Sequence, residues 1–448
     1  MLLEQEKRIP KLFWFIIAFA FAIRLIDSFH SNFHGEEISF VAIVNTISLN
    51  HLPLHSLDHP LMNIYVAKAS EVIFGSSPTG MRMLHILMGV GTVAFVFLVG
   101  RKIFSTGAGL WAAMLLAIDQ FHIGFSRTIF PEVLMLFFAA VTIHRFLIFL
   151  DRNNVWDGLL LGLFASLAYL SKEPGILLLP VFISVLVIYP QYRVKLKRPE
   201  IYIAVLLPIL VIGFDFFGNS LQGFKSSHLH RNISLLQEGI QVSMKPLSLF
   251  LGEFVQLFDP VALDVDYYPS NLYACNMFAG FFYLVSIVFA LMFCDVRRNP
   301  GAGFLFFLFG FVFLFFVFLP GCEFWDPFWW ASLCLLPAVL IAGYVLNGQW
   351  SKKHKKTVRT AGFCLILILV ILYIPRMRNQ GHETVVVTVE QIAKDRIRGG
   401  WQLVEKGDLV LARRNFVYAL NIGGDLPEAV EGIEHVDRLM AERKEQEE

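Results

Sequence analysis

Two adjacent carboxylates, Glu36 and Glu37, stand in the sequence HGEEISF directly before an apolar stretch. Carboxylates are common general bases, and adjacent acids at a helix start face different directions, so one can act while the other orients or binds. The alternative is structural, because acids at a helix N-terminus also complement the helix dipole and its free amides. The local pattern alone favours the structural explanation by roughly two to one.

A third carboxylate, Glu132, follows Pro131 in the sequence SRTIFPEVLMLFF, where an apolar segment begins. Proline followed by an acid is a common N-terminal helix signal, so Glu132 could be only a cap. Topology favours a functional interpretation, since the Lys/Arg count of the loops assigns Glu36, Glu37, Arg127 and Glu132 to one face. Ionisable groups at membrane depth cost about 2.5 to 3.5 kcal/mol each on insertion scales, and they usually mark a site where they converge.

The same face offers basic groups that could hold a phosphate. Arginine suits bidentate contacts to phosphate oxygens, and lysine acts as a point charge. Each of these residues alone is more often a side chain that snorkels to the interface. The stretch from Leu61 to Phe74 has helical apolar spacing and suits a helix lying along the interface, beside the headgroup of a lipid substrate. The candidates are Lys68, Arg82, Arg127 and Lys172.

The elements that must position these residues are predicted to be membrane helices. Of the 448 residues, 56% are hydrophobic and 16% are charged, and the mean hydropathy is +0.61, outside the range of soluble domains. The net charge of +1 does not indicate a nucleic-acid partner. A span needs about 20 apolar residues, and the chain supplies about eleven such runs. They cover approximately 12–26, 83–99, 108–123, 133–150, 156–170, 175–189, 201–217, 272–293, 304–319, 328–346 and 361–374.

The basic clusters orient these spans. The first span lacks a small-residue cleavage site, so it is expected to be a retained anchor with the amino terminus in the cytoplasm. Alternate loops then carry the basic clusters, as the positive-inside rule requires. We therefore expect an all-α transmembrane bundle over residues 1–380, integral to a bacterial or archaeal membrane, with outer loops 28–82 and 218–271 and an extracytoplasmic active site. The clusters begin at Arg101, Arg193, Arg297 and Lys352.

The carboxyl-terminal tail, residues 385–448, is charged and periodic. Its line GWQLVEKGDLVLARRNFVYAL resembles a tetratricopeptide repeat, a module that could bind a protein partner. One repeat cannot bury its own face, since such arrays usually need about three. A single amphipathic hairpin that leans on the membrane domain therefore stays an equal alternative. The small and aromatic positions of the repeat are Gly400, Gly407, Ala412, Phe416 and Ala419.

Residues 59–150 resemble a known superfamily. The segments HPLMNIYVAKASEVIFG, MRMLHILMGVGTVAFVFLVGRKIF and GLWAAMLLAIDQFHIGFSRTIFPEVLMLFF are similar to the protein O-mannosyltransferase and aminoarabinose-transferase superfamily of GT-C glycosyltransferases. HGEEISF stands where those enzymes place an acidic pair. Their second motif matches Ser126, Arg127, Pro131 and Glu132. Their HPP stretch resembles HPL at 59–61, and their threonine–lysine turn resembles residues 171–172.

The resemblance implies a GT-C fold and the inverting transfer of a hexose or pentose from a polyprenyl-phosphate donor to an acceptor hydroxyl. It implies that Glu36 is the catalytic base and that Glu37 and Glu132 bind or orient the acceptor. Arg127 and Lys172 would hold the departing phosphate, because its developing charge needs cations. The acceptor would be a glycan, a lipid or a protein, and the loop 218–271 would select it. Further candidates for substrate binding are His59, Lys68 and Arg82.

Two departures from the family pattern affect the site. The first acid is usually aspartate, and Glu36 lengthens that arm by one methylene group. The late stretch DPFWWASLCLLPAVL lacks a basic residue that relatives often carry, which leaves part of the donor site unassigned. No cofactor is assigned. Three carboxylates could hold a divalent cation, but no set of residues has a diagnostic ligand spacing.

Two other classes of protein fit the same composition. A transporter or flippase of lipid-linked glycans would use the outer acids to bind a cation, but such proteins commonly contain paired repeats, and the acidic motif has no second copy. A noncatalytic membrane scaffold would use the acids as helix caps and the tail as its docking module. Substitution of Glu36 separates the classes, because only a transferase loses turnover while it still binds the lipid carrier.

Overall fold

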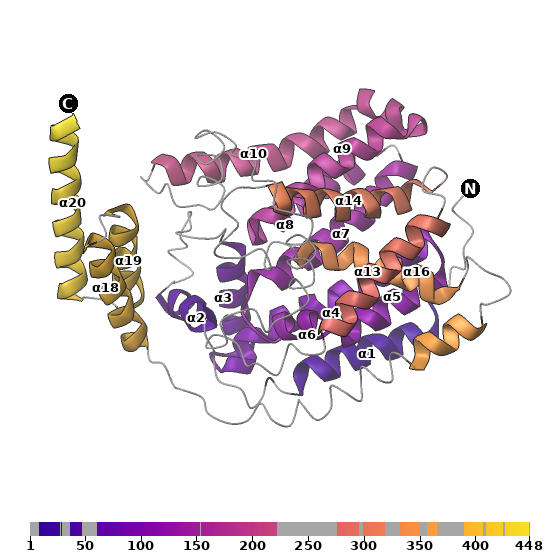
Figure 1. Cartoon of the computed structure of the whole chain (residues 1–448), viewed down its shortest axis with the longest axis horizontal. Coiled ribbons are helices and arrows are strands. Elements are labelled where there is room, and N and C mark those ends of the chain that lie inside the picture. The colour runs from indigo at the N-terminus through magenta and orange to yellow at the C-terminus, as the bar shows by residue number, and fades with distance from the viewer. Residues whose placement is uncertain are drawn as a thin grey trace. The chain divides into compact units, whose positions relative to one another are not determined.

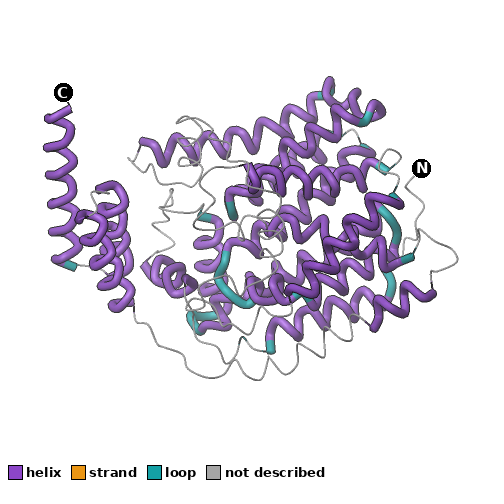
Figure 2. The backbone as a smooth tube through the Cα atoms, viewed as in Figure 1, coloured by secondary structure: helices purple, strands orange, loops and turns teal. Residues whose placement is uncertain are grey.

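The computed structural model describes residues 9–26, 28, 36–46, 61–152, 154–221, 276–294, 299–318, 332–348, 356–364, 389–405, 409–423 and 426–447. Within these ranges the regular elements are helices, and none is a strand (Figure 2). The predicted all-α class is therefore confirmed.

The helices of the first half of the chain follow one another with short connections from residue 61 onward. They are α1 (Lys11–Leu25), α2 (Glu36–Thr46), α3 (Met62–Phe74), α4 (Pro78–Ile103), α5 (Thr106–Ile118), α6 (Gln120–Ser126), α7 (Pro131–Asp151), α8 (Val155–Ser171), η1 (Glu173–Leu177), α9 (Leu178–Ile188), η2 (Pro190–Lys197) and α10 (Pro199–Leu221). Later described elements are α13 (Asn276–Phe293), α14 (Pro300–Phe318), η5 (Ser332–Cys334), α16 (Leu335–Asn347), α18 (Val389–Glu405), α19 (Leu409–Gly423) and α20 (Pro427–Glu447).

Helix α7 forms the core of the bundle. It packs between α4 and α8, and α8 packs in turn against α10 (Figure 1). Most side chains of α7 are buried along its whole length. A helix that is apolar all round must be surrounded by other helices or by lipid. The chain therefore places α7 in the middle, with its two ends at opposite ends of the bundle.

Glycines let neighbouring helices approach closely. A Cβ atom on Gly100 of α4 would lie 2.9 Å from the Cα atom of Gly109 in α5. A Cβ atom on Gly343 of α16 would lie 2.6 Å from the carbonyl oxygen of Ala108, also in α5. Close packing through small residues is a principal source of helix association in membranes. These glycines therefore fix α5 between α4 and α16.

Most of the predicted spans coincide with helices. By length and composition, α4 and α7 could each cross a bilayer. The helices Glu173–Ile188 and Pro190–Lys197, which meet at a bend of 115°, form either a broken third span or a re-entrant loop. The predicted span 108–123 is divided between α5 and α6, because Asp119 ends the first helix and caps the second. Parts of the later predicted spans, such as 365–374 and 328–331, lie outside the described residues. The number of about eleven spans stays a prediction.

Contacts divide the chain into two compact units. The first comprises Met1–Ser31 and Leu54–Gly381, and the second comprises Asn32–Pro53 and His382–Glu448. In the second unit, α2 packs against α18 and α19, and α19 packs against α20. The ring of Phe416 fills the space between helices, since a Cβ atom on Gly400 or Gly432 would lie 2.7 or 2.5 Å from it. The tetratricopeptide likeness of the tail stays a prediction.

Candidate active site at the start of helix α7

The break between α5 and α6 depends on one carboxylate. Asp119 Oδ1 accepts a hydrogen bond from the backbone N–H of His122 at 2.9 Å, which caps α6. Asp119 Oδ2 accepts a second hydrogen bond from the Tyr283 hydroxyl of α13 at 3.1 Å. Asp119 is buried, so both contacts satisfy a carboxylate that water does not reach freely. The acid thus starts a short helix and joins the first half of the chain to α13.

Arg24, at the end of α1, holds this broken segment. Its guanidinium donates to the carbonyl oxygens of Leu116 and Ala117 at 3.3 and 3.2 Å, the last turn of α5. It also lies 2.7 Å from His122 Nδ1 and 3.3 Å from Ser126 Oγ, both in α6. A fully buried cation at a helix C-terminus satisfies free carbonyls and the helix dipole together. Arg24 therefore fixes α6, the helix that precedes the Arg127 turn.

The turn between α6 and α7 is held from two sides. Arg127 donates from its guanidinium to the carbonyl oxygen of Ile23 in α1. From α3, Asn63 Nδ2 donates to the carbonyl oxygen of Ile129 at 3.2 Å. Asn63 Oδ1 lies 2.8 Å from Nε2 of His85 in α4, so the amide is itself fixed. These contacts make the turn a rigid part of the bundle.

Glu132 and Lys172 form a buried ion pair at the start of α7. Pro131 occupies the first turn of the helix and Glu132 follows it, so the carboxylate lies at the positive end of the helix dipole. Lys172 stands between α8 and η1, and its ammonium donates to Glu132 Oε1. The side chains leave 1% and 5% of their surface exposed. Within the described part of the chain, Glu132 Oε2 has no hydrogen-bond partner.

This end of the bundle gathers charges that an apolar core does not need. Arg24, Arg127 and Lys172 are buried cations, and Asp119 and Glu132 are buried acids. Such groups are expensive in a membrane protein and usually mark a site. The cations could hold an anionic group such as a phosphate, and a carboxylate with one unused oxygen could accept a hydrogen bond from a hydroxyl.

Residues 58–214 match the model of the dolichyl-phosphate-mannose-protein mannosyltransferase family. This segment contains Asn63, His85, Arg127, Glu132 and Lys172, and so most of the geometry described above. The match covers the membrane helices from α3 to most of α10.

The chain also superposes on solved structures. ArnT from Cupriavidus metallidurans, in a crystal structure bound to undecaprenyl phosphate, matches with a TM-score of 0.55 and 13% identity, over 94% of this chain and 77% of that one. The oligosaccharyltransferase AglB from Archaeoglobus fulgidus, in complex with an inhibitory peptide and a dolichol-phosphate, matches with a TM-score of 0.52 and 14% identity, over 89% and 59%. The chain has the GT-C fold. At these identities the likeness establishes architecture only.

Two relatives with detectable sequence identity are uncharacterised proteins of Aquifex aeolicus. One is 26% identical over 265 residues, which is 58% of this chain and 48% of the relative. The other is 26% identical over 246 residues, which is 53% of this chain and 55% of the relative. The chain thus matches about half the length of these curated relatives.

The predicted basic residues have different surroundings in the GT-C bundle. Arg82 and Lys172 are buried, and Arg127 is 9% exposed. Lys68 is less buried and pairs with Glu71 of its own helix at 2.8 Å. His59 lies outside the described residues. The structure thus brings Lys172 directly to Glu132, and it holds Arg127 in the turn that precedes Glu132.

The acidic pair belongs to the second unit. Glu36 is the first residue of α2, and its side chain is outside the described set. Glu37 is fully buried within the same helix. Their proposed roles stay predictions. Among the residues that the structure describes, no group of three or more His, Cys, Asp or Glu side chains could hold a metal ion.

The end of the bundle where α7 begins is called the outer end here, after the predicted topology, and the opposite end is called the inner end. Several residues that build the outer end were not among the sequence candidates: Arg24, Asn63, His85, Asp119, His122 and Tyr283. A usable signal existed for two of them, since Arg24 and Asp119 are charged residues inside predicted spans. The others are neutral polar residues, whose partners lie 22 to 164 positions away in the sequence.

Proposed function

We propose that this chain is a membrane glycosyltransferase that moves a sugar from a polyprenyl-phosphate carrier to an acceptor hydroxyl on the extracytoplasmic face. The observation that carries the proposal is the buried Glu132–Lys172 pair, inside the segment that matches the mannosyltransferase family. A buried ion pair contributes little to stability, because desolvation offsets most of its Coulomb energy. A buried ion pair at the start of α7 is better explained by a role in binding or catalysis than by stability.

The donor is proposed from the chemistry of the cations. Undecaprenyl phosphate and dolichol-phosphate, the lipids in the two GT-C structures, both end in a phosphate. Lys172 and Arg127 would stabilise the charge that develops on that phosphate as it leaves. Glu132 holds the Lys172 ammonium in place, so this cation needs no reorganisation during the reaction. Lys68, Arg82 and His59 remain further candidates for binding the carrier.

The proposed reaction is a single displacement. Glu36 removes the proton from the acceptor hydroxyl, and the oxygen forms a bond to the anomeric carbon. The bond between that carbon and the phosphate oxygen breaks, and the phosphate leaves with the electron pair. Because no covalent sugar–enzyme intermediate forms, the configuration at the anomeric carbon is inverted. Glu37 and Glu132 would bind or orient the acceptor.

The proposal also gives the carboxyl-terminal tail a role. Because α2 packs against α18 and α19, the helix that begins with the proposed base rests on the tail. We propose that the tail positions α2, and that a protein partner bound to the tail would act on the base through this helix. Replacement of Ala412 and Ala419, both buried in α19, by leucine should then lower transfer without loss of carrier binding.

The test uses the purified full-length protein in detergent. Mass spectrometry of co-purified lipid should find a polyprenyl phosphate or its sugar-linked form, and ordinary phospholipid alone would contradict the proposal. A panel of polyprenyl-phosphate-linked hexoses and pentoses is then incubated with the protein, and release of free polyprenyl phosphate is measured. Glu36→Gln should abolish release and keep the carrier bound. If Glu36→Gln binds the carrier and releases polyprenyl phosphate as the wild type does, Glu36 is excluded as the base.

A further inference from the structure

A cationic cluster lies at the opposite, inner end of the bundle, far from the charges used above. Arg101 and Lys102 occupy the last turn of α4, and His144 and Arg145 stand on the neighbouring face of α7. The charges of Arg145, Lys102 and Arg101 all act on the His144 ring, so the four groups lie close together. The Lys/Arg count of the loops assigns this end to the cytoplasmic side.

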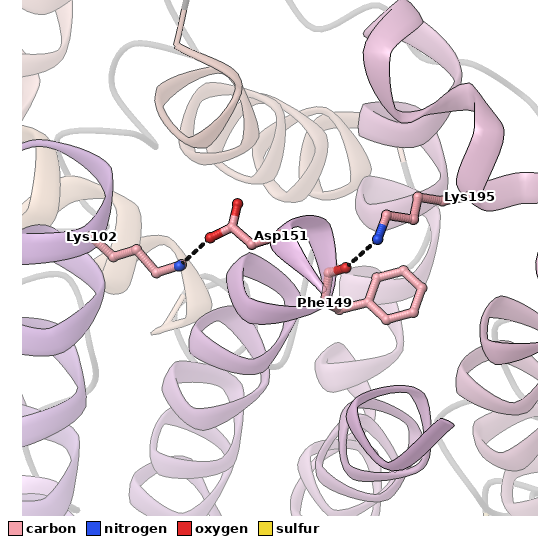
Figure 3. Close-up of polar contacts among 4 residues, drawn as sticks. All are labelled: Lys102, Phe149, Asp151 and Lys195. Carbon is pink, nitrogen blue, oxygen red and sulfur yellow. Dashed lines mark hydrogen bonds and ion pairs between the residues drawn. The ribbon is translucent and has the colours of Figure 1, made fainter. Parts of the chain in front are cut away.

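The acids that the structure describes in this region do not neutralise the cluster. Lys102 pairs with Asp151 (Figure 3). In the described part of the chain, neither Arg101 nor Arg145 forms an ion pair with a carboxylate. Arg101 lies instead over the Phe97 ring, 5.4 Å from its centroid. Among the described residues, no acid compensates these two guanidinium charges, which lie in a partly buried place.

The neighbouring cation Lys195 is already used. Its ammonium donates to the carbonyl oxygen of Phe149 at 2.9 Å (Figure 3). It also donates to the carbonyl oxygen of Arg152, and so it caps the end of α7. This contact explains Lys195 as a structural residue. Among the described residues, no comparable contact to a helix end explains Arg101 or Arg145.

Two buried polar atoms of the cluster also lack partners. Nδ1 of His144 and Nε of Arg145 are inaccessible to solvent, and no hydrogen bond to either is present among the described residues. The His144 ring is held edge-on to Phe95, with 5.6 Å between ring centroids, so it is fixed in place. Nε of Arg145 is a donor without an acceptor among the described residues, and Nδ1 of His144 donates in one of its tautomers, so both could serve an anion from outside the described chain.

The position of Arg145 indicates the source of that anion. Arg145 precedes Asp151, the last residue of α7, by about 9 Å of helix rise. An arginine at this depth reaches the headgroup level by extending its side chain. Guanidinium groups bind phosphate oxygens in pairs, and phosphate is the anion present at that level of a bilayer.

We infer that Arg101, His144 and Arg145 form a phosphate site on the cytoplasmic side, which binds the headgroup of an anionic lipid or a soluble phosphate. The site is separate from the outer-end residues and does not depend on the proposed transferase activity. Basic residues in cytoplasmic loops set topology without specific ligands. These residues differ because His144 and Arg145 lie within the packed helix α7, and two of their buried atoms have no hydrogen-bond partner among the described residues.

The test is native mass spectrometry of the full-length protein with added phosphatidylglycerol. The wild type should retain this lipid in preference to phosphatidylcholine. The double variant Arg101→Gln/Arg145→Gln should weaken retention by about tenfold or more, the loss expected for two charge-assisted contacts. Arg193→Gln is the matched control, because Arg193 is a cytoplasmic arginine on η2 that is exposed. It should leave retention unchanged.

A second variant tests whether the loss of lipid in the double variant comes from misfolding. Arg145→Lys keeps the charge and the topology signal but loses the planar pair of donors, so it should give an intermediate loss. Added inorganic phosphate that displaces no lipid assigns the site to the lipid headgroup. A second outcome is that inorganic phosphate stabilises the wild type but not the double variant against heat, and that the wild type shows no preference for phosphatidylglycerol. This outcome assigns the site to a soluble phosphate. Equal retention and equal stabilisation in all variants would overturn the inference.

Discussion

Both ends of α7 carry a lysine–carboxylate pair, and the two pairs have different surroundings. At the outer end, Lys172 and Glu132 leave 5% and 1% of their side chains exposed. At the inner end, Lys102 and Asp151 each leave 21% exposed, and their charged atoms are 2.5 Å apart. An exposed pair is typically worth 0 to about 1 kcal/mol, whereas breaking a buried pair costs about 3 to 5 kcal/mol. The same residue types thus have different consequences at the two ends.

The difference extends to the atoms around each pair. At the inner end, Lys195 donates to the carbonyls that end α7, so this terminus is capped by the chain itself. At the outer end, Glu132 Oε2 stays without a hydrogen-bond partner in the described chain. At the inner terminus the last carbonyl oxygens of α7 have a partner from the chain, as a stable helix end requires. The outer terminus has an unused buried oxygen beside a fixed cation, and such an oxygen could accept a hydrogen bond from a ligand hydroxyl. For this reason the proposed chemistry is assigned to the outer end.

The largest expected effect comes from removing Lys172 at the outer end, and the removal of Lys102 at the inner end is the comparison. Lys172→Ala leaves the Glu132 charge buried and unpaired, so the free energy of unfolding should fall by about 3 to 5 kcal/mol. Release of polyprenyl phosphate should fall by about a hundredfold or more, as for the loss of a group that stabilises transition-state charge. Lys102→Ala should cost no more than about 1 kcal/mol and leave release unchanged. Chemical unfolding and the release assay measure both quantities, and equal losses in the two variants would remove the distinction between the ends.

The second prediction separates stability from function at the outer pair. The double variant Glu132→Leu/Lys172→Met replaces both charges by apolar groups of similar size, which is often neutral or stabilising. Its unfolding midpoint should return to within a few degrees of the wild type, and its transfer activity should stay absent. If activity returned together with stability, the pair would be a structural element and the proposed role of Lys172 would be wrong.

These contrasts also mark what the sequence could predict. Composition and apolar runs predicted the all-α membrane class, and motif resemblance predicted the GT-C fold, both of which are confirmed. The positive-inside count grouped Arg127, Glu132 and Lys172 on one face, and the structure places the last two in contact. Hydropathy works here because a bilayer imposes a length on each apolar helix.

The sequence could not predict the polar contacts that hold the outer end. The span predicted over 108–123 was wrong at its end, because one carboxylate, Asp119, starts a new helix and only the fold supplies its partner Tyr283. Asn63 lies in an apolar segment and has no local signal, although it ties α3 to the Arg127 turn. Such contacts depend on residues that are distant along the chain. The packing of α2 against the tail is another example.

The third prediction compares an asparagine at each end. Asn63→Ala leaves the carbonyl of Ile129 and the His85 ring without their shared partner, so stability should fall by about 1 to 3 kcal/mol. The turn that carries Arg127 should loosen, and release should fall by about tenfold. Asn154→Ala removes only the cap of α8 at the inner end, where Asn154 Oδ1 accepts from the N–H of Trp156. It should cost about 1 kcal/mol without a change in release. Unchanged release in Asn63→Ala would show that the turn does not need this support.

The smallest effect is expected at the inner terminus of α7. Lys195→Ala removes the ammonium from the carbonyl oxygens of Phe149 and Arg152, so the free energy of unfolding should fall by about 1 to 2 kcal/mol. Transfer should not change, because this end of α7 has no proposed part in the reaction. Lys195→Arg should recover part of the loss, since a guanidinium can also donate to carbonyls. Arg193→Ala on the same element removes one exposed hydrogen bond, to the carbonyl oxygen of Val187, and should lower stability less than Lys195→Ala. In Lys195→Ala, the transfer rate could fall by more than the fraction of folded protein. That result would mean that a change at the inner end alters the outer end through α7. The separation of roles between the two ends would then be wrong.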